Sequence, residues 1–314
     1  MNHLHFRKAT FREIPEIKKL WKEVFGDAND YISRFITHFG IENCYICEIN
    51  NAVVAMAFAI PTNLKSPSNF EGVPVVTEQS RSEGRGSLSK IIYIYACATH
   101  PDFQSQGIMK MLIETVYNEA CKENYAGIFL QAAHQPLIRY YQELGFEAFF
   151  FRDHSFYYNH KEHEEATKYT KSDKGINPIA VSSELCENPL RPLRLNIISP
   201  ENYYQKRRQK LKNHCFVNWN EDFFRFLNES GTQFCEYKNT IFSFKTHINT
   251  IIVDELLGET PHEQIADLLF EKLPDFEVVH IRSMGNEFCC GQIKWCCLQT
   301  KNHPKCGWLG FAME

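Results

Sequence analysis

The stretch from Cys97 to Met109, CATHPDFQSQGIM, combines residue types and spacing that could bind a phosphate group. It lies between an apolar run at 90–98 and a segment with apolar residues at helical spacing over 109–120. Backbone N–H groups at the start of a helix lack intrahelical partners, and Gly107 adds no side chain that would block them. A strand, a glycine and then a helix therefore predict a positively polarised pocket for a pyrophosphate.

The elements around this stretch follow an order that occurs twice in the chain. Each half is predicted to contain a strand, two helices, three strands, a helix and a further strand. In the first half the strands fall at 3–8, 43–49, 53–60, 90–98 and 128–132, with helices at 14–25, 31–39, 109–120 and 137–144 and a hairpin at 146–158. In the second half the strands fall at 193–199, 233–237, 241–247, 250–257 and 276–281, with helices at 200–211, 221–228 and 260–273. The pattern predicts two domains of mixed α+β structure, at 1–158 and 189–314, joined by a polar linker at 159–188.

The phosphate-binding stretch resembles the motif of the GCN5-related N-acetyltransferase (GNAT) family. That motif begins with Arg or Gln, continues after two residues with Gly, and ends after one more residue with Gly or Ala. In this chain Gln104 and Gly107 occupy the first two motif positions, and Met109 replaces the final Gly or Ala. The segment 138–146, IRYYQELGF, is similar to the family's tyrosine-to-LGF signature. The resemblance extends over residues 3 to about 155. The chain's ending, 291–314, resembles the tails of two-domain members such as the enhanced-intracellular-survival type.

The resemblance implies two GNAT-like domains, each a central, mostly antiparallel twisted sheet flanked by helices, with an active first and a degenerate second domain. In the second half only Gly258-Glu-Thr260 separates the strand from the helix. This connection is too short for a phosphate-binding loop, and the neighbouring carboxylates would repel a pyrophosphate. We therefore expect no CoA site there.

The resemblance also implies which residues bind acyl-CoA, between the strand that ends at Thr99 and the strand that ends near Ala132. Gln104 opens the motif. Backbone N–H groups would hold the pyrophosphate at Gln106, Gly107, Ile108 and Met109. Main-chain groups of Cys97 and Thr99 would pair with the pantetheine arm as an added strand does.

Tyr141 occupies the family's general-acid position and would protonate the departing CoA thiolate. The general base is less defined, because the strand at 90–99 contains no carboxylate. His134, just beyond the next strand, is one candidate, and the terminal carboxylate of Glu314 is the other. Cys97 is expected to be an inert thiol because burial in a strand raises a thiol pKa.

The resemblance favours an acyl-CoA-dependent N-acyltransferase that moves an acetyl group from acetyl-CoA to a primary amine by direct attack in a ternary complex. A catalytically inactive CoA-binding regulator is the alternative, supported by Met109 and the missing carboxylate but not by the retained Tyr141. A third hypothesis is a structural or peptide-binding protein with a relic fold. The basic run at 206–212, KRRQKLK, is predicted to be a solvated helix face and not a nucleic-acid site.

Composition and charge limit the partners and the cellular location. The net charge is -4, and the first residues contain no apolar segment typical of a signal peptide, so we expect a cytoplasmic protein that binds neither nucleic acid nor membrane. Without an export signal the twelve cysteines are predicted to be reduced, and no metal is expected. The expected partners are acetyl-CoA and a small-molecule or peptide amine, bound by a monomer or homodimer. The polar stretch 61–89 is predicted to be a long loop and a candidate mobile lid.

Overall fold

The computed structural model describes residues 3–67, 87–159, 195–296 and 306–311. Contacts between Cα atoms divide the chain into two compact units. Unit 1 contains 1–151, 211–226 and 289–314, and unit 2 contains 152–210 and 227–288, in each case over the residues described. The units therefore do not follow a simple split into an N-terminal and a C-terminal half. The predicted linker at 159–188 lies, apart from Asn159, outside the described residues.

Unit 1 is built on a mixed sheet whose strands lie in the order β1-β2-β3-β4-β5-β13. These strands are β1 (His5–Lys8), β2 (Cys44–Ile49), β3 (Ala52–Lys65), β4 (Leu88–Thr99), β5 (Gly127–Leu130) and β13 (Phe288–Trp295). β4 and β5 pair in parallel, whereas each of the other adjacent pairs of strands in this order is antiparallel. The mostly antiparallel sheet flanked by helices that the sequence predicted is thus confirmed.

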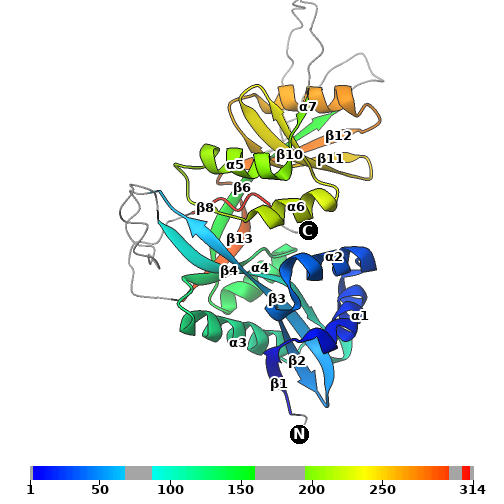
Figure 1. The fold of residues 1–314 in the computed structure, drawn as a ribbon, viewed down its shortest axis with the longest axis vertical. Helices are drawn as coiled ribbons and strands as arrows, with labels where there is room; N and C mark the ends of the chain where they lie inside the picture. The colour runs from blue at the N-terminus through cyan, green and yellow to red at the C-terminus, as the bar shows by residue number, and fades with distance from the viewer. Residues whose placement is uncertain (1–2, 68–86, 160–194, 297–305, 312–314) are drawn as a thin grey trace, which may run out of the picture. The chain divides into compact units, whose positions relative to one another are not determined.

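Helices cover both faces of the unit 1 sheet (Figure 1). They are α1 (Ile14–Phe25), α2 (Asn29–Phe39), α3 (Ile108–Lys122) and α4 (Gln135–Glu143). Alternate residues of β3 face opposite sides, as the period of a strand requires. Phe58 packs against Trp21 of α1 and Phe35 of α2, whereas Ala57 belongs to the core cluster that includes α3.

Unit 2 repeats the strand order of unit 1, with β7-β9-β10-β11-β12-β6 as its sheet. Its strands are β7 (Asn196–Ile197), β9 (Gln233–Tyr237), β10 (Thr240–His247), β11 (Thr250–Leu257), β12 (Val278–Met284) and the second part of β6 (Glu147–Tyr158). β11 precedes and β12 follows α7 (His262–Lys272) in the chain, and the two strands pair in parallel. In the same way β4 precedes and β5 follows α3, and these two strands also pair in parallel. α7 packs on a core of apolar residues from β10, β11 and β12, and α5 (Pro200–Lys210) contacts β9 and β10.

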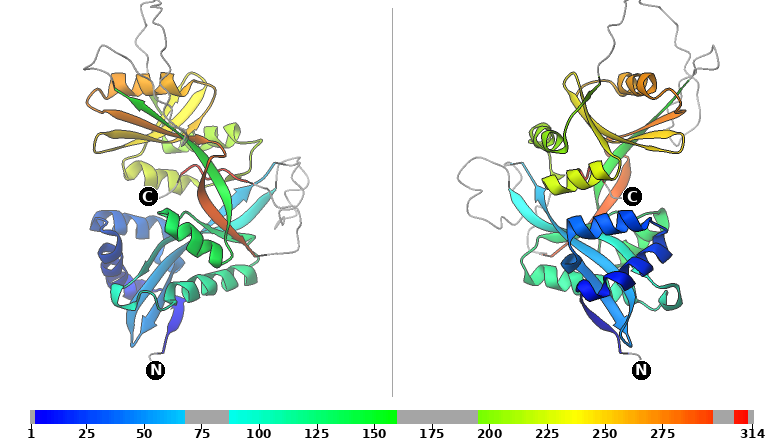
Figure 2. Two further views of the ribbon diagram at one scale, coloured as in Figure 1. Left: turned by 180° about the vertical axis from the view of Figure 1, so that it is seen from behind. Right: turned by 45° about the vertical axis from the view of Figure 1, so that its right-hand side comes forward.

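The two halves of the chain exchange their closing strands, which are drawn from two sides in Figure 2. β6, from the first half, pairs antiparallel with β12 in unit 2. Arg152 lies opposite Met284 at one end of this pairing, and Tyr158 lies opposite Val278 at the other. β13, from the second half, pairs antiparallel with β5 in unit 1, where Gly127 lies opposite Trp295 and Leu130 lies opposite Gln292. The predicted hairpin at 146–158 is therefore wrong: β6 is one continuous strand, and its antiparallel partner comes from the other half of the sequence.

Another segment of the second half belongs to unit 1. β8 (Phe216–Val217) pairs with the end of β3, through Leu64–Val217 and Lys65–Phe216, and α6 (Glu221–Glu229) begins in this unit. The predicted loop at 61–89 is consequently shorter, because β3 continues to Lys65 and β4 begins at Leu88. Most of the predicted lid, 68–86, lies outside the described residues.

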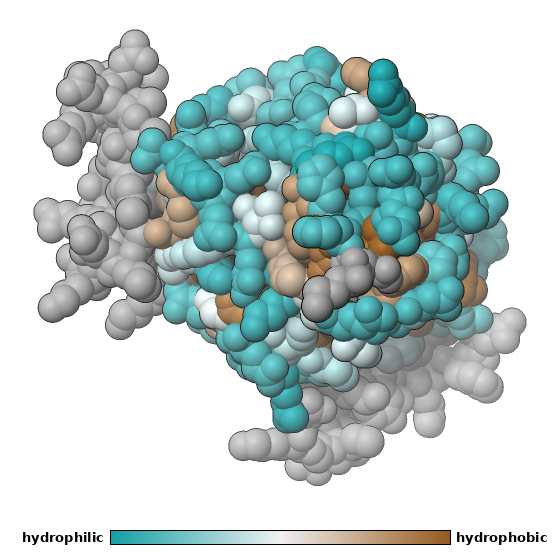
Figure 3. Space-filling view, turned by 90° about the horizontal axis from the view of Figure 1, so that it is seen from below, coloured by the Kyte–Doolittle hydropathy of each residue, from teal (hydrophilic) through white to brown (hydrophobic). Residues whose placement is uncertain are grey.

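The polar residues of these elements lie mainly on the surface. The face in Figure 3 is predominantly hydrophilic, with apolar side chains visible over limited areas. Among the helices of the described ranges, none has the length and apolar character needed to cross a membrane.

Candidate functional site

β4 and β5 separate at one end of the unit 1 sheet. The two strands pair in parallel from Ile91, which lies opposite Gly127, to Tyr93, which lies opposite Phe129. β5 ends one residue later, at Leu130, whereas β4 continues to Thr99. The edge of β4 beyond Tyr93 therefore faces the separation and can accept an extended ligand as an added strand does.

A β-bulge at Ala96 changes the direction of the side chains where the strands separate. Ala96 has φ 52°, in the left-handed region that non-glycine residues rarely adopt. In the pairing with β3, Tyr95 lies opposite Phe58 and Ala98 opposite Met56, so Ala96 and Cys97 together face Ala57. Bulges of this kind redirect side chains next to functional sites.

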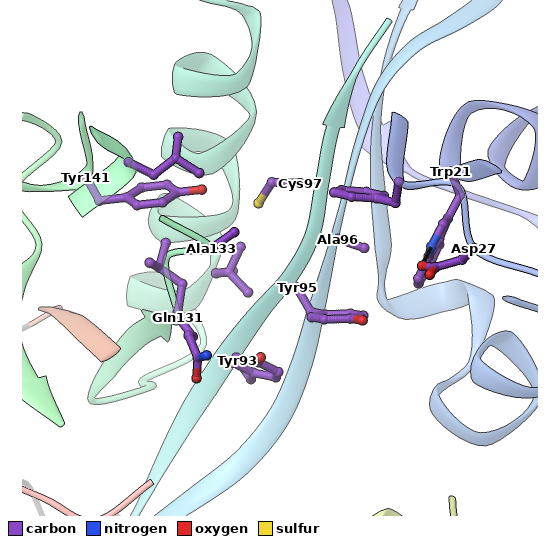
Figure 4. A pocket seen from close by; sticks show the side chains of 13 residues that line it. Trp21, Asp27, Tyr93, Tyr95, Ala96, Cys97, Gln131, Ala133 and Tyr141 are labelled. Carbon is purple, nitrogen blue, oxygen red and sulfur yellow. Dashed lines mark hydrogen bonds between the residues drawn. The ribbon is translucent and has the colours of Figure 1, made fainter. Parts of the chain in front are cut away.

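A cavity of about 480 Å³ opens at this separation (Figure 4). Its aromatic lining residues are Trp21, Phe25, Tyr93, Tyr95 and Tyr141. The other lining residues are Ile94, Ala96, Leu130, Ala133 and Leu137, together with the polar residues Asp27, Cys97 and Gln131. A volume of this size is typical of a site for a small molecule.

The predicted phosphate-binding loop leads from β4 into α3. Gly107 is the N-cap of α3 with φ 76°, and a Cβ atom at this position would meet no heavy atom within 4 Å. Glycine is favoured here because of its backbone conformation and not because of crowding. The Met111 N–H donates to the Gly107 carbonyl at 3.1 Å, so the N–H groups of the preceding turn have no intrahelical acceptor.

Side chains of the loop hold its backbone in place. Gln104 Nε2 donates to the Thr99 carbonyl at 3.1 Å, and Gln106 Nε2 donates to the Asp102 carbonyl at 3.3 Å. Gln104, Gln106 and Gly107 are exposed, whereas Ile108 is buried and Met109 packs against the core. The side chain of Ile108, directly after the glycine, is therefore part of the core, whereas the loop residues before it are exposed.

Tyr141 of α4 and Cys97 of β4 both line the cavity. Figure 4 shows the two side chains pointing toward one another. Burial, with the nearby Cys97 and Tyr140 as lesser causes, raises the pKa of Tyr141 well above the ordinary value for tyrosine. Burial also raises the pKa of Cys97 to about 12, so at neutral pH this thiol is protonated and a poor nucleophile.

The structure describes one of the two candidate bases. His134 is the exposed N-cap of α4 and does not itself line the cavity, although Ala133 beside it does. Glu314 lies outside the described residues.

Sequence reasoning missed the contribution of the end of α1 to the cavity. Trp21, Phe25 and Asp27 all line it, and the Trp21 indole Nε1 donates to Asp27 Oδ2 at 2.7 Å. Helical spacing predicts that Trp21 lies on the apolar face of the helix at 14–25 and that Gly26-Asp27 ends this helix, and the stretch from Leu20 to Asp27 is typical of bacterial family members, but none of this predicts that Asp27 faces a cavity. The available signal was a carboxylate directly after a helix whose buried face carries an indole donor.

Residues 11–146 match the family model described as "Acetyltransferase (GNAT) family". This part of the chain is a GNAT acetyltransferase domain. The match ends before β6, and the second half of the sequence is not covered by it. A comparison with curated proteins found no match.

Solved structures share the fold across both halves of the chain. A GCN5-related N-acetyltransferase from Kribbella flavida has a TM-score of 0.61 at 10% identity, over 94% of this chain and 70% of that one. A conserved protein from Enterococcus faecalis V583, described as a probable N-acyltransferase, has a TM-score of 0.63 at 12% identity, over 95% and 73%. Eis1 from Mycobacterium abscessus has a TM-score of 0.57 at 9% identity, over 95% and 74%. At these identities the similarity concerns the fold alone.

The described part of unit 2 differs from unit 1 at the place that corresponds to the cavity. The parallel β11–β12 register ends at Val253–Ile281, and directly beyond it Arg282 donates to Asp254 Oδ1 at 3.0 Å. Both side chains are buried, so an ion pair occupies the place where β4 and β5 separate in unit 1. The N-cap of α7 is Pro261, which has no N–H group to donate to an anion.

The cysteines and acidic side chains in the described ranges do not form a metal site. No three of the described His, Cys, Asp or Glu residues gather as ligands would. Each cysteine within these ranges is a free thiol.

Proposed function

We propose that this protein is a cytoplasmic N-acyltransferase that moves the acetyl group of acetyl-CoA to a primary amine by direct attack in a ternary complex. The observation that carries the proposal is the cavity of the GNAT domain at the point where β4 and β5 separate, because the buried Tyr141 lines it. The Gly107 N-cap of α3, which follows β4 in the chain, supports the proposal as a second feature.

In this proposal acetyl-CoA lies along the free edge of β4. The N–H groups of Gln106 to Met109 bind the pyrophosphate, as helix N-termini commonly do. Main-chain groups of Cys97 and Thr99 bind the pantetheine arm, and the thioester lies beside Tyr141. The Ala96 bulge supports this arrangement because it turns β4 at the point where the Cys97 side chain meets Tyr141.

The acceptor nitrogen attacks the thioester carbonyl carbon, forming a C–N bond, and the C–S bond then breaks. An ammonium substrate must first lose one proton, for which His134 is the candidate among the described residues and the Glu314 carboxylate stays a prediction. The second proton is lost from nitrogen as the amide forms, and the CoA sulfur gains a proton. Tyr141 donates a hydrogen bond to this sulfur, and burial keeps its phenol in the protonated form.

We assign CoA binding to unit 1 alone. The Asp254–Arg282 ion pair and the Pro261 cap support this assignment, because the first fills the counterpart of the cavity and the second removes a donor. Unit 2 then serves to supply β6 with a partner strand.

Thermal unfolding with and without acetyl-CoA tests the proposal, using the wild type and Gly107→Glu. A ligand at 100 times its dissociation constant should stabilise the wild type by about 2.7 kcal/mol, and the added carboxylate should remove this stabilisation. Gly231→Glu is the matched control, because Gly231 is also an exposed glycine with positive φ and free space around it. It should lose stability through strain but keep the acetyl-CoA response.

The same proteins should then be incubated with amines and assayed for acetylated product by mass spectrometry. Product formed by the wild type and by Gly231→Glu, but not by Gly107→Glu, would support acetyl transfer. Stabilisation by acetyl-CoA without product from any amine would support the inactive CoA-binding regulator instead. No stabilisation and no product would exclude both functions.

A further inference from the structure

The walls of the cavity are mainly aromatic where α1 approaches β4. Trp21 is 1% exposed, and its ring lies 5.8 Å from that of Tyr95 between centroids. Tyr95 in turn stacks on Tyr93 at 5.8 Å with an interplanar angle of 28°. Phe25 is 45% exposed and adds a ring at the rim. Rings held at these distances form surfaces that suit a flat apolar group.

These rings also contact residues that do not line the cavity. The Tyr95 hydroxyl group lies 3.1 Å from that of Tyr31, and Trp219 packs edge-on against Tyr93 at 5.4 Å. These contacts hold both tyrosines in place, so the walls are organised before a ligand enters, which reduces the entropy lost on binding.

Asp27 supplies the charge in this cavity. Among the described residues that line it, Asp27 is the one acidic residue, and none is a lysine, arginine or histidine. Its Oδ2 accepts the Trp21 indole hydrogen bond at 2.7 Å, which orients the carboxylate. Figure 4 shows Asp27 and Tyr141 on opposite sides of the cavity, with Tyr93 and Tyr95 between them. A carboxylate beside aromatic faces is favourable for an ammonium group through an ion pair and cation–π attraction.

One carboxylate neutralises one positive charge. Any further ammonium group on the part of a ligand that contacts these walls would be desolvated without a counter-ion, which is unfavourable. A volume of about 480 Å³, shared with the acetyl end of the cofactor, also suits a small ligand.

We propose that the acceptor is a small primary amine with a single ammonium group on an aromatic or similarly flat apolar body, and that Asp27 binds the ammonium group. This inference rests on the proposed acetyl transfer and specifies its substrate class. Asp27 is a binding residue in this scheme: it attracts the ammonium group as the amine enters, and the amine then moves across the cavity toward Tyr141, where its nitrogen loses a proton and attacks the thioester. Polyamines and lysine side chains of peptides are predicted to be poor acceptors.

The test compares 2-phenylethylamine with spermidine and with a lysine-containing peptide, by product formation with acetyl-CoA. We expect kcat/KM for 2-phenylethylamine to be at least ten times kcat/KM for spermidine and for the peptide. Preference for spermidine or the peptide would overturn this inference and leave the acetyl transfer intact. No product from any amine, together with no stabilisation by acetyl-CoA, would overturn the proposed function and this inference with it.

Asp27→Asn tests the role of the carboxylate while keeping an oxygen that can accept the Trp21 hydrogen bond. We expect KM for 2-phenylethylamine to rise at least tenfold, with stabilisation by acetyl-CoA unchanged. The neutral analogue 2-phenylethanol should inhibit both proteins with similar constants, because its binding uses the aromatic walls alone. Asp30→Asn is the charge-matched control, since Asp30 is exposed in the first turn of α2 and does not line the cavity.

Two results would exclude Asp27 as the ammonium-binding residue. One is an unchanged KM in Asp27→Asn. The other is an equal loss of affinity for 2-phenylethylamine and 2-phenylethanol, which would indicate a change in the shape of the cavity and not the loss of a charge.

Discussion

At the scale of single residues, Tyr141 and Cys97 show how burial changes chemistry within the GNAT site. Both groups titrate above their ordinary pKa because the cavity is poorly solvated. For Cys97 this means an unreactive thiol, so the cysteine in the cavity is not a nucleophile. For Tyr141 it means a phenol that stays protonated, and in the acetyl transfer proposed above this phenol would donate to the CoA sulfur.

We predict that Tyr141→Phe lowers kcat about 100-fold or more, within the range usual for loss of a general acid. Stabilisation by acetyl-CoA should be retained, because the backbone of the phosphate loop is unchanged. Tyr140→Phe is the control, since Tyr140 is the adjacent residue of α4 and does not line the cavity. Steady-state kinetics would contradict the assignment if the two variants lost activity equally.

The raised pKa of Tyr141 also predicts a dependence of stability on pH. In the folded state this phenol stays protonated at pH values above the ordinary tyrosine pKa of about 10. In the unfolded chain the phenol loses its proton as the pH rises through about 10. The resulting stabilisation is complete below about pH 10 and is lost as the pH rises toward the folded-state value. The fall in melting temperature above pH 10 should therefore be smaller in Tyr141→Phe than in Tyr140→Phe.

At the scale of elements, β5 joins the GNAT site to the second half of the chain. On one side it pairs with β4 only as far as Phe129, which leaves the cavity open beyond that pair. On the other side β13 pairs with it along its whole length. Gly127 allows this pairing, because a Cβ atom there would lie 2.8 Å from the Lys294 carbonyl oxygen and 3.3 Å from Trp295 Cα.

We predict that Gly127→Ala destabilises the protein by about 1–3 kcal/mol, since the obstructing atoms are backbone and β13 must move to relieve the contact. Urea denaturation followed by tryptophan fluorescence would measure this change. Gly231→Ala, whose Cβ atom would meet nothing within 4 Å, should cost only the left-handed strain, about 1 kcal/mol. Equal midpoints for Gly127→Ala and the wild type would show that β13 does not lie this close to β5.

At the scale of the whole molecule, each half of the sequence completes the structure formed by the other. β13 closes the sheet of unit 1, β6 closes the sheet of unit 2, and β8 extends along β3. The wall of the cavity also depends on the second half, because Trp219 packs against Tyr93 and donates its indole hydrogen to the Leu309 carbonyl at 3.1 Å. A GNAT domain cut from this chain at 158 would lack all of these contacts.

We predict that neither residues 1–158 nor residues 189–314 fold stably when expressed alone, and that the two fragments co-purify when expressed together. Each fragment alone would expose the unpaired edge of a sheet, which favours aggregation. The full-length protein is the control, and only the paired fragments should recover stabilisation by acetyl-CoA. A monomeric 1–158 fragment with the wild-type response to acetyl-CoA would show that the first half can close its own sheet.

Local sequence patterns were sufficient for most elements of both halves, including the strand, glycine and helix around Gly107, whereas the roles of this loop and of Tyr141 came from the family resemblance and stay predictions. Each of these elements depends on residues close together in the chain: a glycine before a helix, the spacing of apolar residues, and the alternation in β9, β10 and β11. The repeated order of elements was visible for the same reason. The structure confirmed the mixed sheet with flanking helices that followed from it.

Only the tertiary structure decided which strands close each sheet and which carboxylate faces the cavity. The long apolar and aromatic stretch at 146–158 suggested a hairpin because single strands are usually shorter, about 5–6 residues. Its partner, β12, lies more than a hundred residues further along, and nothing in either strand specifies the other. Likewise, Asp27 follows a helix in sequence but meets Tyr93 and Tyr95 only because α1 packs on β4. Pairing of strands and convergence on a cavity depend on the packing of distant segments, and this information is not contained in the local pattern of any one of them.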